Sequence, residues 1–205
     1  MTQTQPINFV RGPAPEDSAR ADIYALLARL LYAGPDAAVL AAIAAADHLA
    51  AQSETPFPLA WRDLQRASVV ADAVAVADEY TRLFVGVGRA PVSIYASHYL
   101  TENFKELTLV HLRQELDRLG LARKPIATEP EDHLAGLLDV MRYLLQRNDG
   151  DVAAQASFFN SYLKPWITKF CDAVVETEGA VYYRTLCRMM KAYFTIEVEY
   201  FEWTV

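Results

Sequence analysis

The sequence contains little cysteine and little histidine, and neither residue occurs at the spacing of a metal site. Its 205 residues include 2 cysteines and 4 histidines. Cys171 and Cys187 form no Cys-x-x-Cys pair, so neither a zinc knuckle nor a redox motif is indicated. The histidines form no His-Glu-x-x-His pattern. We therefore expect no bound metal, no cofactor of its own and a reducing, cytoplasmic setting.

Positive charge and long apolar runs are also scarce. Lysine and arginine number 19 against 26 aspartates and glutamates, which gives a formal net charge of -7 and a pI near 5.1. Because nucleic-acid binding depends on basic side chains that neutralise phosphates, we expect no nucleic-acid partner. Charged residues interrupt the longest apolar segments, so no stable membrane insertion is expected. The acidic balance favours a cationic partner.

What the sequence does contain predicts one all-α domain. Hydrophobic residues make up 53% of the chain, which is enough for a single core. We expect residues 1–17 to form a flexible lead-in and residues 18–205 to form a single-domain globular bundle of about seven to ten helices. The expected helices cover residues 16–34, 36–50, 61–86, 101–120, 128–145, 151–177 with a break at Pro165, and 180–203, and residues 86–100 are expected to be non-helical.

Three acids and a histidine precede one of these helices. Thr128 and Glu131 have the spacing of a capping box, and Pro130 is acceptable in a first helical turn. His133 is not explained by the helix signal, since a charged imidazole is unfavourable at the positive end of a helix dipole. The apolar residues that follow at helical spacing predict one buried face: Leu134, Leu137, Leu138, Met141, Leu144 and Leu145.

Catalytic interpretations of this cluster are weak. Ser93 or Ser97 with His133 and Asp132 supplies the residue types of a hydrolase triad, but no nucleophile elbow surrounds either serine. A metal site from Asp132, His133 and His98 lacks a known ligand spacing. The glycines of residues 86–90 fall short of a phosphate-binding loop. We therefore expect no enzyme, and keep the small Ser/His/Asp hydrolase as an alternative.

A binding surface is the stronger interpretation. Tyr80, Leu83 and Phe84 share one face of the helix that ends near Gly86, although core packing is the better explanation for Leu83 and Phe84 taken singly. An aromatic, non-helical segment with Tyr95 follows directly, and loops of this kind on a helical scaffold often carry recognition.

The aromatic-x-x-Leu-Phe motif of residues 80–84, the Pro-Val-Ser-Ile-Tyr loop of residues 91–95 and the Glu-Pro-Glu-Asp-His motif of residues 129–133 together resemble the TorD/DmsD family of redox-enzyme maturation chaperones. The resemblance extends over most of the chain. It implies a TorD-like helical chaperone that binds the twin-arginine signal peptide of a molybdenum oxidoreductase catalytic subunit. Such a chaperone keeps the apo subunit in the cytoplasm until bis(molybdopterin guanine dinucleotide), or bis-MGD, is inserted. The implied signal contacts are Tyr80, Leu83, Phe84, Pro91, Asp132 and His133.

The chemistry of a twin-arginine peptide fits these residues. Carboxylates of Asp132 and of Glu129 or Glu131 can take guanidinium groups, and a neutral His133 can bond the peptide or fix the loop. Where the family often has an aromatic residue, Val92 follows Pro91, so we expect Tyr95 to serve instead. The predicted signal-peptide site is Tyr80, Leu83, Phe84, Pro91, Ser93, Tyr95, Glu129, Asp132 and His133.

Several alternatives stay open at this point. Asp132 alone would also serve as an acid that complements a helix dipole, and His133 as a core histidine bonded to the backbone. Such a pair would still organise the groove without touching the ligand. A separate alternative is a chaperone that grips the folded body of a non-exported client. A monomer is expected, with a domain-swapped dimer as the alternative. Weak guanine-nucleotide binding is a trait of the family that no motif here supports.

Overall fold

A computed structural model describes residues 14–46, 54–86, 89–100, 105–123, 128–147 and 151–204. This part contains ten α-helices, one π-helical turn and no strand, so the predicted all-α fold is confirmed. The elements are α1 (Pro15–Tyr32), α2 (Ala37–Ala45), α3 (Pro56–Val70), α4 (Ala73–Tyr80), η1 (Thr81–Val85), α5 (Ser97–Leu100), α6 (Lys105–Arg118), α7 (Leu134–Gln146), α8 (Val152–Tyr162), α9 (Ile167–Glu176) and α10 (Tyr182–Thr204).

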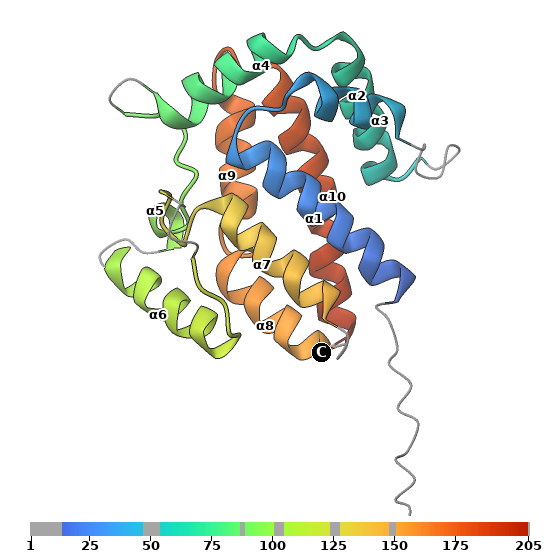
Figure 1. Cartoon of the computed structure of the whole chain (residues 1–205). Helices are drawn as coiled ribbons and strands as arrows, with labels where there is room; N and C mark the ends of the chain where they lie inside the picture. Colours follow the sequence, from blue (N-terminus) through green and yellow to red (C-terminus); the bar gives the residue numbers. More distant parts are fainter. Residues whose placement is uncertain are drawn as a thin grey trace, which may run out of the picture.

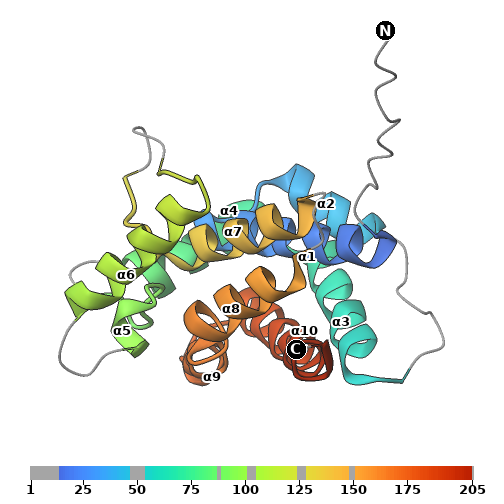
Figure 2. The same ribbon diagram turned by 90° about the horizontal axis from the view of Figure 1, so that it is seen from below.

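The helices form two layers. α1 packs along α7, and α10 packs on α3 and α9 (Figure 1). Seen from below, α1 and α7 lie above α8, α9 and α10, while α5 and α6 stand to one side (Figure 2). All six apolar residues predicted for one face of the helix that became α7 are buried between the layers. No helix of the described part is long and apolar enough to cross a membrane.

Several predicted boundaries are wrong. Residues 97–100, predicted to be non-helical, form α5, and α3 begins at Pro56 instead of Trp61. α1 begins at Pro15, since proline suits a first helical position and Glu16 and Asp17 complement the dipole. The lead-in therefore ends before residue 17, and residues 1–13 lie outside the described part. The helix predicted over residues 61–86 is divided at Ala71 and Asp72. Asp72 accepts the backbone N–H of Ala75 at 2.9 Å and starts α4 as a new helix.

The break predicted at Pro165 is confirmed, because α8 ends at Tyr162 and α9 starts at Ile167. Beyond that break, α10 is tied to the rest of the fold by a buried carboxylate. Glu79 of α4 accepts the N–H groups of Val181, Tyr182 and Tyr183 at 2.8 to 3.0 Å. These are groups at the start of α10 that have no partner within the helix. A negative charge at this end also complements the helix dipole.

Candidate functional site

The acidic segment of residues 128–132 precedes α7 instead of starting it, so the predicted capping box is wrong. His133 is the cap, and its Nδ1 accepts the N–H of Ala135 at 3.2 Å. Backbone pairing holds the segment outside the helix. Leu134 donates its N–H to the carbonyl of Ile94, and Ala96 donates to the carbonyl of Asp132, both at 3.0 Å. A bond between segments so distant in the sequence overrides the local helix signal.

This pairing joins two of the three motifs that the sequence singled out, the loop of residues 91–95 and the acidic motif of residues 129–133. Tyr95 and His133 form an antiparallel bridge, and their rings meet edge to face at 5.3 Å. The Tyr95 hydroxyl donates to the Glu129 carboxylate. Ser93 supports the same turn, because its Oγ accepts the N–H of Tyr95 at 3.4 Å. The aromatic loop and the acidic segment are therefore one structural unit.

His133 lies at the centre of this unit. Burial lowers the pKa of its ring, and the negative charges of Glu129 and Asp132 oppose this only in part. The ring is therefore neutral at pH 7. Because Nδ1 accepts from Ala135, the proton of the neutral ring is on Nε2, which is left as a donor. Tyr32, at the end of α1, packs its ring edge to face with the imidazole at 6.3 Å.

Asp132 is buried, and its carboxylate faces the protein interior. Its Oδ2 accepts the N–H of Ser97 at 3.0 Å, at the start of α5. This arrangement contradicts the small Ser/His/Asp hydrolase that the sequence analysis kept as an alternative. His133 Nδ1 carries no proton for Asp132, and the Ser93 hydroxyl bonds within its own loop. No cluster of three or more metal-ligating side chains occurs among the residues that the structure describes.

The aromatic-x-x-Leu-Phe motif belongs to the core. Leu83 and Phe84 are buried, and the Phe84 ring stacks on Phe170 with 5.8 Å between centroids. The Tyr80 hydroxyl donates to the carbonyls of Leu31 and Tyr32 at 3.2 and 2.8 Å, where it closes the end of α1. These three side chains lie behind the acidic unit and do not line the groove described next. Pro91 is exposed on the loop.

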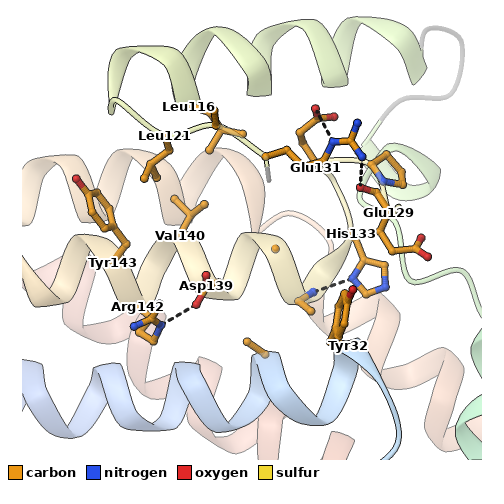
Figure 3. A pocket seen from close by; sticks show the side chains of 16 residues that line it. Tyr32, Leu116, Leu121, Glu129, Glu131, His133, Asp139, Val140, Arg142 and Tyr143 are labelled. Carbon is orange, nitrogen blue, oxygen red and sulfur yellow. Dashed lines mark hydrogen bonds and ion pairs between the residues drawn. The ribbon is translucent and has the colours of Figure 1, made fainter. Parts of the chain in front are cut away.

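A groove of about 820 Å³ runs between α7, the end of α1 and the connection from α6 to α7. Figure 3 shows its two ends. Glu129, Glu131 and His133 lie at one end, together with Tyr32. Tyr143 lies at the other end, and three aliphatic side chains line this part of the groove: Leu116, Leu121 and Val140. One end therefore carries the acidic side chains, and the other is mainly aliphatic and aromatic and also includes the ion-paired Asp139 and Arg142.

The sequence analysis missed the apolar end of the groove. Tyr143 falls outside the buried face of α7 and is exposed. An aromatic residue on the outer face of an amphipathic helix, beside Asp139 and Arg142, is the signal that would have pointed to it. Leu121 follows Gly120, whose φ of 71° ends α6 and turns the chain toward the groove.

Two arginines hold the Glu131 carboxylate at the acidic end. Arg113 of α6 donates to its Oε2 at 2.9 Å, and Arg123 lies 3.5 Å from its Oε1. The hydrogen bond from Arg113 lowers the pKa of Glu131, although partial burial acts in the opposite direction. Glu131 is therefore a carboxylate at every pH near neutrality.

Comparison with known proteins gives matches across this region. The family model described as nitrate reductase delta subunit matches residues 45–172, more than half of the chain, and the match contains all three motifs. The chaperone protein TorD of Shewanella sp. (strain ANA-3) is 32% identical over 108 residues, 51% of each chain.

Two further relatives carry the same name. The chaperone protein TorD of Pasteurella multocida (strain Pm70) is 34% identical over 116 residues, 52% of this chain and 55% of its own. The protein of that name in Aliivibrio fischeri (strain ATCC 700601 / ES114) is 23% identical over 133 residues, 60% of this chain and 62% of its own. The chain thus spans between half and two thirds of the length of these curated relatives.

Proposed function

Because the chain belongs to the TorD/DmsD family, whose model is described as nitrate reductase delta subunit, we propose that it is a chaperone dedicated to the catalytic subunit of a molybdenum oxidoreductase. It binds the twin-arginine signal peptide of the apo subunit in the cytoplasm. By covering the signal, it delays export until bis-MGD has been inserted. It acts as a monomer and performs no chemical step itself.

The two-ended groove is the observation that carries this proposal. A twin-arginine signal has two adjacent guanidinium groups followed by an apolar segment that readily becomes helical. Carboxylates bind guanidinium groups through paired, charge-assisted hydrogen bonds, and Glu129 and Glu131 lie at the acidic end. An apolar helix face suits a groove lined by aliphatic and aromatic side chains such as Leu121, Val140 and Tyr143.

The remaining predicted residues support the groove from behind in this proposal. His133 offers its Nε2–H to a carbonyl of the peptide, while Asp132 and Tyr95 fix the segment that carries Glu129. Tyr80, Leu83 and Phe84 contribute through the core on which that segment rests. The net charge of -7 steers a cationic peptide toward the protein.

The test is a titration of the purified chain with a fluorescent signal-type peptide that contains Arg-Arg and an apolar segment. Glu129→Gln and Tyr143→Ala, one at each end of the groove, should each weaken binding about tenfold or more. Val85→Ala, an exposed change away from the groove, is the matched control and should bind like the wild type. Circular dichroism checks that helicity is kept. No binding of the peptide to the wild type would refute the proposal.

The identity of the client comes from a second experiment. The tagged chain is recovered from its host while the client operon is expressed, and the co-purified proteins are identified by mass spectrometry. We expect a molybdenum-enzyme precursor that still carries its signal, and its loss with Glu129→Gln and Tyr143→Ala combined. Light scattering of the purified chain distinguishes the monomer from a domain-swapped dimer.

A grip on the folded body of a non-exported client is the second candidate. An exposed apolar patch where α3 meets α4 favours it, made of Val69, Val70 and Val74. In this case a client subunit without any signal should bind as well as the full precursor. Val70→Asp with Val74→Asp should then weaken binding, whereas Glu129→Gln should not.

A further inference from the structure

Arg113 and Arg123 occupy the carboxylate that the proposed function assigns to an incoming basic peptide. Each oxygen of Glu131 has a different arginine: Oε2 has Arg113 at 2.9 Å and Oε1 has Arg123 at 3.5 Å. Arg123 also donates from Nη1 to the carbonyl of Glu129 at 3.5 Å. Two guanidinium groups of the chain therefore already lie at the acidic end of the groove.

We propose that Arg113 and Arg123 are internal competitors of the arginine pair of the signal, and that a peptide enters the groove by displacing at least one of them from Glu131. This inference rests on the proposed function. It gives the two arginines a role in specificity: they set how strongly a peptide must bind elsewhere in the groove before its own arginines reach the carboxylate.

The exposure of the three side chains makes such an exchange feasible. The side chains of Arg113 and Arg123 are 54% and 42% exposed, whereas that of Glu131 is 12% exposed. Exposed guanidinium groups turn into water at small cost, because exposed ion pairs contribute little to stability. The carboxylate stays in place, since it is largely covered and is fixed beside the backbone bridge at His133.

The exchange also explains why charge alone would be insufficient for binding. Replacing one guanidinium on Glu131 by another exchanges equivalent hydrogen bonds, so the net gain is small. The gain in affinity must then come from the other end of the groove, where an apolar peptide segment would bury surface against Leu121, Val140 and Tyr143. A peptide with two arginines but no apolar segment should leave Arg113 and Arg123 in place.

The test compares two double variants with equal charge. Arg113→Gln with Arg123→Gln removes the competitors. Arg66→Gln with Arg118→Gln removes two arginines whose partners, Asp63 and Glu115, lie on their own helices. We expect the first variant to bind the Arg-Arg apolar peptide about tenfold more tightly than the second, and to begin binding an Arg-Arg peptide without the apolar segment.

A spectroscopic readout separates displacement from a merely structural role. In wild-type protein labelled with ¹⁵N-arginine, the peptide should shift the Nε–Hε signals of Arg113 or Arg123 and leave that of Arg118 unchanged. If the wild type binds the peptide and the first variant binds it no better than the charge-matched one, this inference is overturned and the proposed function stands. If no variant and no wild-type protein binds the peptide, both are overturned.

Discussion

Two clusters of arginine and glutamate in this fold differ in how far their side chains are exposed to water. Glu197 of α10 accepts Nε and Nη2 of Arg20 from α1 at 2.8 and 2.9 Å, and the Tyr24 hydroxyl at 2.8 Å. Its side chain is 1% exposed, and the guanidinium lies over the Tyr200 ring at 4.1 Å. At the groove, Glu131 has two arginines that are about half exposed.

The difference shows that ion pairs between arginine and glutamate have two different roles in this fold. Burial acts to lower the pKa of Arg20, but the hydrogen bond and charge of Glu197 outweigh it and raise the pKa overall. Because removing either partner would leave a charge away from water, the Arg20 cluster fixes α1 to α10. The Glu131 cluster has water as a ready substitute for each arginine. We therefore regard the Glu197 cluster as a structural contact that persists and the Glu131 cluster as a contact whose arginines exchange.

The largest effect is expected from breaking the buried cluster. Arg20→Leu leaves the Glu197 carboxylate without its cation, and should lower the free energy of unfolding by about 3–5 kcal/mol. Urea denaturation followed by circular dichroism measures it. Arg66→Leu, which removes an exposed partner of Asp63, is the control and should change little. A double change of Arg20 and Glu197 to leucine should recover much of the lost stability. If the double variant is destabilised as much as Arg20→Leu alone, the uncompensated charge of Glu197 is not the cause.

Variants in the π-helical turn η1 can distinguish an effect on core stability from an effect on peptide binding. Leu83→Ala creates a cavity in a fully buried position and should cost about 2–5 kcal/mol of stability. Val85→Ala in the same turn is exposed and should be nearly neutral. At a temperature where Leu83→Ala is folded, its affinity for the signal-type peptide should equal that of the wild type. A selective loss of affinity would return Leu83 to the binding surface.

A smaller effect is expected from acidification at the groove. The pKa of His133 is lowered in the folded protein from its usual 6.5, mainly by burial. The unfolded chain therefore binds a proton at His133 before the folded chain does, and stability should fall as pH drops below about 6.5. His133→Asn keeps a side-chain cap and removes the titration, so its stability should change less between pH 7 and pH 5. If stability falls equally with pH in the wild type and in His133→Asn, the titration of His133 is not the cause.

The smallest effect is expected from the exchanging contact itself. Arg113→Gln should leave the urea midpoint within experimental error of the wild type, because water replaces the lost guanidinium on Glu131. Together with the loss expected for Arg20→Leu, this result would define the contrast between the two clusters. A marked decrease in the midpoint would place Arg113 among the structural residues.

The sequence predicted what depends on local pattern. The apolar spacing from Leu134 to Leu145 identified the buried face of α7, and Pro165 identified the break between α8 and α9. The helix start was misplaced at Thr128 because the bond between Leu134 and Ile94 depends on residues far apart in the chain. No periodicity reports such a contact.

The candidate site was predicted in part for the same reason. The loop and the acidic segment do meet, through Tyr95, Glu129 and His133. The motif residues Leu83 and Phe84 could be assigned to core or surface only once packing was known. The roles of Arg113 and Tyr143 depend on how α6 and α7 are placed, which no short motif encodes.

The bonds of Glu79 to the start of α10 also bear on the order of folding during synthesis. They join residues 102 to 104 positions apart, and the Arg20–Glu197 pair spans 177 positions. On the ribosome, Glu79 and Arg20 lack these partners in α10 until that helix has emerged. These contacts can form only after α10 has been made, so this part of the fold is completed late in synthesis. We therefore expect a nascent chain that lacks α10 to be incompletely folded and unable to bind the proposed client.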